Sequence, residues 1–127
     1  MAFLLKGARV VDPQLNLEAV MDVRIDGETI AEVAATVKPQ EGDTVIDAKG
    51  KVLTPDMHVH FRDPGFEYKE TIETGSRAAV HGGFTDVATM PNTNPVTDNG
   101  PAVRFQIDRG NEVGLIHVCP MGALTKG

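Results

Sequence analysis

Apolar and polar residues alternate in short runs over the first 53 residues, which predicts β-strands joined by tight turns. The run FLLKGARVV, residues 3–11, is rich in strand-forming residues and ends at an Asp-Pro pair. The segment QLNLEAVM, residues 14–21, follows it and is expected to form a loop. This region therefore begins as a β-structure rather than as a helical one.

Two further units of the same region are expected to be hairpins. Residues 22–33 carry apolar positions on both sides of Asp26-Gly27, a pair that favours the positive φ values of a hairpin turn. Residues 44–55 repeat the pattern around a Lys-Gly pair. Strands of this length and spacing are typical of a small sandwich or barrel, too short to enclose a large core alone.

After Pro55 the pattern changes to strands that alternate with helical segments. Gly82-Gly83 is expected to end the first helix with a left-handed cap. Asp98 or Asn99 is expected to cap the second helix, with Pro101 in its first turn. The predicted order is strand 56–61, helix 70–81, strand 84–90, helix 101–110 and strand 114–122. This alternation predicts βαβ units and a parallel sheet, hence an α/β fold.

Composition narrows the class of partner. The chain has 12 Lys and Arg against 18 Asp and Glu, a net charge of −6, which disfavours binding to nucleic acid. No apolar run approaches the roughly 20 residues of a membrane span, and the N-terminus lacks the pattern of a signal peptide. The single cysteine, Cys119, excludes an internal disulfide and fits a reducing compartment. We therefore expect a cytoplasmic protein with no membrane or nucleic-acid partner.

The segment DMHVHFRDPG carries the first group of chemically informative residues. Alternate side chains of a strand share a face, so His58 and His60 are expected to point the same way and suit one divalent ion. Arg62 joins that face if the strand continues, and its guanidinium can grip a carboxylate. Asp56 is expected on the same strand face as His58 and His60, where it either orients an imidazole or caps the start of the strand. His-x-His alone is a weak pattern, and two incidental histidines are the alternative.

The segment ATMPNTNPV, at the exit of the next strand, carries the second group. The amide of Asn92 suits an imide, ureido or carboxylate group of a substrate. Alternatively, Asn92 closes an Asx turn in a loop of turn-forming residues. His81 is interpreted as a helix-end residue, His117 as a half-buried structural histidine, and Cys119 as a packed thiol.

The stretch from Pro55 to Asp98, with HxHxR followed by MPNTxP, resembles the N-terminal part of the dihydroorotase family within the amidohydrolase superfamily. The resemblance extends from Phe3 to the final MGALTKG and so covers nearly the whole chain. HxHxR with MPNTxP is far more specific than HxH alone. The sequence departs in FRDPG, where LREPG is expected, without altering the two histidines.

The resemblance implies a zinc-dependent (β/α)₈ barrel preceded by part of a small β-sandwich. Residues 1–53 would be the sandwich segment, and residues 54–127 the first βα units of an incomplete barrel, because a closed barrel needs about 250 residues. We therefore expect the chain to be the leading piece of a longer protein, or a truncated product.

The implied reaction is the reversible interconversion of N-carbamoyl-L-aspartate and dihydroorotate in pyrimidine biosynthesis. By motif, His58 and His60 would bind one or two zinc ions, and His60, Arg62 and Asn92 would contact the substrate. Arg62 and Asn92 would hold its carboxylate. The general base and the remaining metal ligands are expected beyond residue 127, so the isolated chain is expected to be inactive.

Two alternatives stay open at this point. The first is a cyclic amidase of the hydantoinase or allantoinase type, which also carries HxH but usually lacks Arg at the position of Arg62. The second is a non-catalytic dihydroorotase-like scaffold for aspartate carbamoyltransferase, against which the retained His58, His60 and Arg62 argue. The expected partners are a small-molecule substrate and, at the protein level, a second copy of the chain or aspartate carbamoyltransferase.

Overall fold

The computed structural model describes residues 1–54 and 56–125, with the backbone alone of Asp56. The chain is a mixed α/β structure and divides after Thr54 into two compact units, each treated by itself below. Neither helix within the described residues combines the length and apolar character that crossing a membrane requires.

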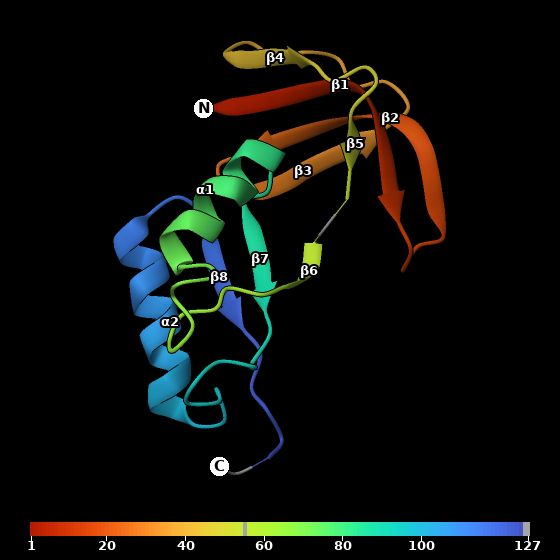
Figure 1. Ribbon diagram of the computed structural model, residues 1–127. Helices are drawn as coiled ribbons and strands as arrows, with labels where there is room; N and C mark the ends of the chain where they lie inside the picture. Colours follow the sequence, from red (N-terminus) through yellow and green to blue (C-terminus); the bar gives the residue numbers. More distant parts are fainter. Residues whose placement is uncertain (55, 126–127) are drawn as a thin grey trace. The chain divides into compact units, whose positions relative to one another are not determined.

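The first unit is a five-stranded sheet (Figure 1). Strands β1 and β2, and β2 and β3, pair antiparallel, while β4 and β5 both run parallel to β1. Side chains from β1 and β2, with Val37 from the loop after β3 (Thr29–Ala34), form the buried centre. The strands are β1 (Ala2–Asp12), β2 (Leu17–Asp26), β3 (Thr29–Ala34), β4 (Asp43–Asp47) and β5 (Val52–Leu53).

The expected loop over residues 14–21 is wrong for most of its length. Strand β2 begins at Leu17, which pairs with Asp12, so only a short turn separates the first two strands. Pairing with a long neighbouring strand overrides the weak local pattern of this segment. The hairpin over residues 22–33 is confirmed, with its turn one residue later than expected. Gly27 (φ 60°) and Glu28 connect the paired Asp26 and Thr29.

The second expected hairpin, over residues 44–55, is wrong. Instead of pairing with each other, β4 and β5 lie one after the other along the same edge of β1. The turn between β4 and β5 is joined to β1 at both of its ends. Ala48 N–H donates to Lys6 O, and Arg9 N–H donates to Lys51 O. This turn lies opposite an irregularity in β1, between Leu5 and Ala8, which interrupts the regular ladder.

A buried carboxylate organises this irregularity. Asp22 is 4% exposed and accepts hydrogen bonds from Lys6 Nζ (2.6 Å), Gly7 N (2.8 Å) and Val37 N (3.0 Å). The ammonium group of Lys6, reinforced by the two backbone donors, lowers the pKa of Asp22 from 3.8 to about 2. Asp22 thus joins β2, the bend of β1 and the loop at Val37.

A second ion pair anchors the start of β4. The Nε and Nη2 atoms of Arg24 both donate to the carboxylate of Asp43, at 3.0–3.2 Å, in the forked geometry that favours arginine. The side chain of Asp43 is 1% exposed and also accepts from Gln40 N. The hydrogen bond from Arg24, followed by that from Gln40, lowers the pKa of Asp43.

The second unit is a βαβαβ arrangement, in which a parallel sheet of order β6-β7-β8 is covered on one face by two helices (Figure 1). Phe61, Ile72, Val87, Ile116 and Val118 form its core between the helices and the sheet. The predicted alternation of strands and helices is confirmed. The elements are β6 (Asp56–Val59), α1 (Ile72–Gly82), β7 (Asp86–Thr89), α2 (Gly100–Val113) and β8 (His117–Pro120).

The caps of helix α1 follow from its sequence. Thr71 and Thr74 form a reciprocal capping box at its N-terminus. Ile72 N–H donates to the buried carboxylate of Asp63 at 3.3 Å. Gly83, with φ 85°, caps the C-terminus as expected. Exposed His81 lies in the last turn, where a cation suits the helix dipole.

Helix α2 starts as predicted and ends later. Asn99 is its N-cap and accepts from Ala102 N at 3.0 Å, with proline in the first turn. The helix continues past Gly110 to Val113 and is capped by Gly114. Gly110 does not stop the helix because its missing side chain serves packing: a Cβ there would lie 2.7 Å from a methyl carbon of Val118.

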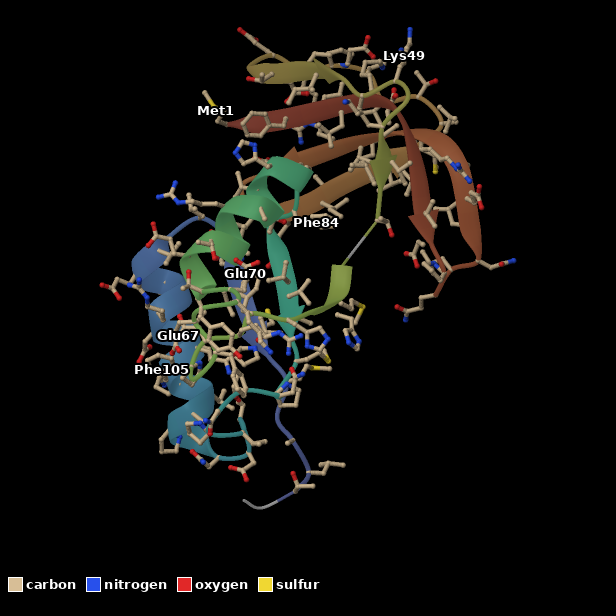
Figure 2. The ribbon with its side chains drawn as sticks, viewed as in Figure 1. Met1, Lys49, Glu67, Glu70, Phe84 and Phe105 are labelled. Atoms are coloured by element: carbon tan, nitrogen blue, oxygen red, sulfur yellow. The ribbon has the colours of Figure 1, made fainter. Side chains whose placement is uncertain are left out.

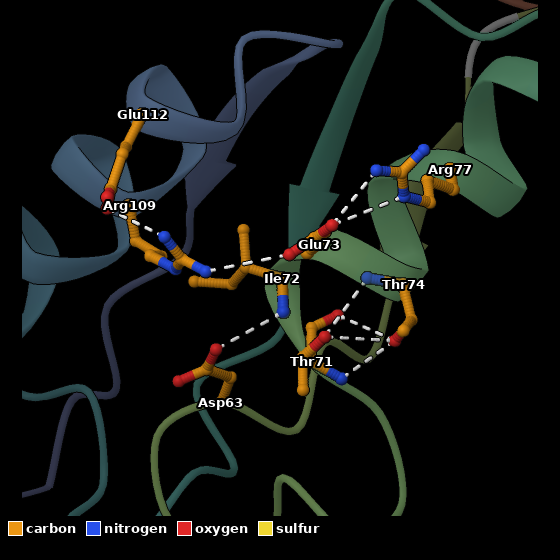
Figure 3. A network of polar contacts seen from close by, with 8 residues as sticks. All are labelled: Asp63, Thr71, Ile72, Glu73, Thr74, Arg77, Arg109 and Glu112. Carbon is orange, nitrogen blue, oxygen red and sulfur yellow. Dashed lines mark hydrogen bonds and ion pairs between the residues drawn. The ribbon is translucent and has the colours of Figure 1, made fainter.

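Charged residues join the outer surfaces of the two helices (Figure 3). Glu73 accepts from Arg77 at 3.0 Å within α1 and lies 3.8 Å from Arg109 of α2, which also pairs with Glu112. These side chains are between 34% and 71% exposed, so each pair contributes little to stability.

Two residues of β8 are less buried than expected. The side chain of His117 is 66% exposed and pairs with Asp86 at 2.9 Å, and Cys119 is also exposed. The expectation of a half-buried histidine and a packed thiol is wrong, because both alternate with the core residue Val118 and so belong to the sheet face opposite the helices. Hydrogen bonds to Asp86, first from Thr85 and then from His117, lower its pKa.

Candidate metal and substrate site

Two histidines meet at the carboxyl end of β6. His58 lies in the strand and His60 directly follows it. Val59 and Phe61, which alternate with them, pack into the core beneath the helices. The imidazoles therefore belong to the opposite face, as the alternation predicts, and their Nε2 atoms lie 3.2 Å apart.

This separation suits a shared divalent cation. Two nitrogens at the usual zinc distance of about 2.0–2.1 Å, joined at a tetrahedral angle, lie about 3.3 Å apart. The measured Nε2–Nε2 distance of 3.2 Å is close to that value. Nitrogen donors are also of the type that zinc prefers. The pair of His58 and His60 therefore fits two adjacent positions of a zinc site.

Asn92 fixes the orientation of the second histidine. Its Oδ1 lies 2.8 Å from Nδ1 of His60. An amide oxygen only accepts hydrogen bonds, so the ring carries its proton on Nδ1 and keeps the lone pair of Nε2 for a cation or for His58. Metal-binding histidines almost always have such a partner on their other nitrogen. The side-chain oxygen of Asn92 thus makes a contact with His60 that the sequence alone did not indicate.

The loops that carry these residues are locked together by backbone packing. Asn94 N–H donates to Pro64 O at 2.9 Å, which joins the loop after β7 to the loop after β6. Gly65 lies against the same residue, since a Cβ there would approach Asn94 O to 2.1 Å, and its φ of 99° also favours glycine. The relative placement of His60 and Asn92 thus depends on backbone contacts between the two loops.

Arg62 lies beyond the strand, in the loop that leads to α1. It is half-buried, and its carbonyl accepts from Phe66 N at 2.9 Å. Among the described residues, its guanidinium makes no hydrogen bond to the side chain of His60 or Asn92, which bond to each other. The same loop carries Glu67, labelled in Figure 2, whose pKa is lowered mainly by a hydrogen bond from Gly65 N.

The donor set is incomplete for a catalytic metal. Such zinc sites usually have three protein ligands, and over residues 1–54 and 57–125 no group of three His, Cys, Asp or Glu side chains is placed to hold a metal ion. The side chain of Asp56, considered above as an orienting group, lies outside the described residues.

Sequence reasoning missed the buried polar residues beneath the Asn92 loop. Gln106 is 1% exposed and bonds to two threonines, one at the end of β7 and one in the loop. Its position was a usable signal, because Gln106 interrupts the helical stripe of Val103, Ile107 and Gly110 on α2. A polar residue on a buried stripe indicates a hydrogen-bond partner across the interface.

Known proteins are similar in sequence to this chain over nearly its whole length. A family model described as Dihydro-orotase-like matches residues 50–127. A dihydroorotase of Sulfurihydrogenibium sp. is 50% identical over 98% of this chain, and one of Geobacter sulfurreducens is 45% identical over all of it. The chain spans 30% and 31% of the lengths of these two relatives.

Solved structures agree with the sequence matches. An L-hydantoinase (dihydropyrimidinase) from Arthrobacter aurescens superimposes with a TM-score of 0.68 at 25% identity, over 94% of this chain and 27% of that one. A dihydropyrimidinase from Brevibacillus agri superimposes with a TM-score of 0.62 at 25% identity, over all of this chain and 28% of its own. The chain belongs to the dihydro-orotase-like family of amidohydrolase enzymes.

Proposed function

We propose that this chain supplies part of the active site of a zinc-dependent hydrolase of cyclic amides, which reversibly interconverts N-carbamoyl-L-aspartate and dihydroorotate in pyrimidine biosynthesis. The observation that carries the proposal is the pair of imidazole nitrogens 3.2 Å apart, with Asn92 bound to the second ring. Membership of the dihydro-orotase-like family supports the choice of reaction.

The proposal includes a larger fold. Residues 54–127 form the first units of a (β/α)₈ barrel, and residues 1–53 form one segment of a small β-sandwich. Within the described residues, β6 and β8 each have one paired edge, and Cys119 and His117 are exposed on the sheet face away from the helices. Further strands would pair those edges and close that face, as parallel sheets require.

The site residues then divide the work. His58 and His60 hold zinc through Nε2, with Asn92 keeping the His60 proton on Nδ1. A zinc ion bound by these two histidines would supply Lewis-acid chemistry, namely a water nucleophile near neutral pH and polarisation of the amide carbonyl. His60, Arg62 and Asn92 contact the substrate, and Arg62 with Asn92 binds its carboxylate. Binding of this kind orients the ring in ground and transition state alike, so Arg62 acts mainly on affinity.

The remaining parts lie outside this segment in the proposal. No general base is assigned among residues 1–127; the base and further ligands, for one or two zinc ions, would follow it. The isolated chain would therefore be inactive. The whole protein would act in the cytoplasm on a small-molecule substrate, as a homodimer or in association with aspartate carbamoyltransferase.

The site is tested by substitution in the protein that naturally contains this chain. His58→Ala and His60→Ala should each remove bound zinc and ring-closing turnover together. Arg62→Lys keeps the positive charge but loses the planar guanidinium that donates two parallel hydrogen bonds to a carboxylate. The KM for N-carbamoyl-L-aspartate should therefore rise about tenfold or more, while the zinc content is retained. An unchanged KM in Arg62→Lys would contradict the carboxylate clamp, and full activity in His60→Ala would contradict the metal site.

A second candidate function is a hydantoinase-type cyclic amidase, because L-hydantoinase is among the structural neighbours. Dihydroorotate and dihydrouracil share a ring and differ in the carboxylate, so their relative kcat/KM separates the two candidates. The proposed function requires a strong preference for dihydroorotate that Arg62→Lys weakens. Efficient hydrolysis of dihydrouracil that is insensitive to Arg62→Lys would favour the hydantoinase type.

A further inference from the structure

A chain of buried polar groups runs beneath the loop that carries Asn92. The loop, residues 90–99, has no regular secondary structure, yet the side chains under it are almost fully shielded from water. They come from β7, the loop and α2. These side chains are Thr89 and Thr97 at 0% exposure, Gln106 at 1% and Thr93 at 4%.

Their hydrogen bonds have one consistent direction. The hydroxyl of Thr93 donates to Pro95 O at 2.7 Å, so its oxygen is available to accept from Thr97 at 2.9 Å. The oxygen of Thr97 in turn accepts from Nε2 of Gln106 at 2.6 Å. Oε1 of Gln106 accepts from the hydroxyl of Thr89 at 2.9 Å. With the amide in this orientation, each of the four side chains has a partner.

Burying the amide of Gln106 at this position costs desolvation free energy. Gln106 lies on the buried stripe of α2, between Val103 and Gly110, where a leucine or methionine would pack without burying an amide. A buried amide is tolerated only when its donors and acceptors are satisfied. Here the partners of Gln106 are the last residue of β7 and a residue of the loop, so the amide ties that loop to both the sheet and the helix.

The hydrogen bonds of Gln106 restrain Asn92 through the residues next to it in the loop. Pro91 O accepts from the backbone N–H of Thr93 at 2.9 Å and of Thr97 at 3.1 Å, which closes the loop around the network. Asn92 lies between Pro91 and Thr93, so both of its flanks are held. Its own side chain is exposed and reaches His60 at 2.8 Å.

We propose that Gln106 is a positioning residue, which acts through Thr97 and Thr93 to hold Asn92 against His60 and so keeps the His60 proton on Nδ1. The consequence for metal binding rests on the proposed function, whereas the position of the proton does not. Without the tie, the loop samples more conformations, the contact to His60 is made for less of the time, and the ring takes up the Nε2–H tautomer as well.

The primary experiment replaces Gln106 by methionine, which keeps the length and the packing but removes the amide. Long-range ¹H–¹⁵N spectra of histidine-labelled, metal-free protein at about pH 8 report which nitrogen of His60 is protonated. The wild-type protein should show the Nδ1–H form, and Gln106→Met a mixture with the Nε2–H form. Competition with a chelator should show about tenfold weaker zinc binding.

Matched variants separate positioning from general destabilisation. Asn92→Ala should shift the tautomer and the zinc affinity at least as far, and adding Gln106→Met to it should change neither any further. Ser76→Ala removes a hydroxyl that is equally buried, at 1% exposure, on α1 and has no hydrogen-bond partner among the described residues, so it should leave both readouts unchanged. Thr93→Val removes one link with little change of shape, and it provides the test if Gln106→Met fails to fold.

The outcomes distinguish the two proposals. A wild-type Nδ1–H tautomer in folded Gln106→Met or Thr93→Val would overturn the positioning role, even in an active zinc enzyme. Additive loss of zinc affinity in Asn92→Ala with Gln106→Met would overturn it as well, since the two residues would then act separately. A shifted tautomer in a protein that hydrolyses no cyclic amide would support the positioning role and contradict the proposed function.

Discussion

In the first unit the buried polar side chains are carboxylates held by cations, whereas under the Asn92 loop of the second unit they are neutral hydroxyls and an amide. Asp22 with Lys6, and Asp43 with Arg24, fasten strands to one another. The attraction within such pairs depends on the ionisation of the acid. The neutral network around Gln106 has no charge to lose, so its stability depends on distances and angles. The two units should therefore fail under different perturbations.

The largest expected effect is steric and belongs to the second unit. Gly65→Ala places a Cβ 2.1 Å from Asn94 O, at a φ of 99° that residues with side chains rarely adopt. Overpacking and backbone strain together should cost about 3 kcal/mol or more of unfolding free energy. Hydrogen exchange in the second unit, compared with wild type, gives the measurement.

The matched control for that variant is Gly100→Ala, whose Cβ would meet no atom within 4 Å at the start of α2. It should change stability by no more than about 0.5 kcal/mol. Equal effects of Gly65→Ala and Gly100→Ala would remove the argument that the two site loops are locked together.

The next effect is a pH dependence that belongs to the first unit. The folded pKa of Asp22 is about 2, below its ordinary value of 3.8. Its stabilising contribution is therefore fully present above about pH 4 and is lost as the pH falls towards 2. Asp22→Asn should be less stable than wild type at neutral pH, and its stability should fall less steeply between about pH 4 and pH 2. Hydrogen exchange of the Gly7 and Val37 amides measures both effects.

Lys6→Met sharpens the same comparison. It leaves the carboxyl group of Asp22 in place but removes the largest cause of its lowered pKa. The loss of stability as the pH falls should therefore be intermediate between those of wild type and Asp22→Asn. A decline in Asp22→Asn as steep as in wild type would mean that other carboxylates govern the acid response of this unit.

The smallest expected effect is at the surface of the second unit. The pair of Glu73 and Arg77 in Figure 3 is solvent-exposed, with Arg77 at 64%. Arg77→Ala should lower the unfolding free energy by about 0.3–0.5 kcal/mol, and the difference should shrink in about 1 M salt. Denaturant unfolding at two salt concentrations checks it. A loss above about 1 kcal/mol would show that surface charge matters here as much as the buried groups.

Local signals sufficed where the decisive interactions lie within a few residues. The caps at Gly83 and Asn99 were predictable from residue type, and the face shared by His58 and His60 from strand periodicity. The contact of Asn92 with His60 crosses 32 positions of sequence, so no local pattern contains it. Resemblance to a family pointed to Asn92 as a site residue, but not to the histidine as its partner.

The expectations differ from the structure where a partner in another element decides the conformation. Leu17 extends a strand because it pairs with Asp12 of β1. Strands β4 and β5 both pair with β1, one after the other along the same edge, instead of pairing with each other. Gly110 resembles a helix stop and is instead a packing residue against Val118. In each case the deciding contact is made with a residue of another strand or helix, which the local sequence does not reveal.

The divided edge formed by β4 and β5 has a consequence for solubility. A long, straight border strand exposes a row of unpaired amides that another molecule can extend into an aggregate. Here the border consists of one piece of five residues and another of two, separated by a turn that carries Lys49 and Lys51. A foreign strand would find a short template flanked by positive charge, so this side of the sheet resists growth into intermolecular β-structure.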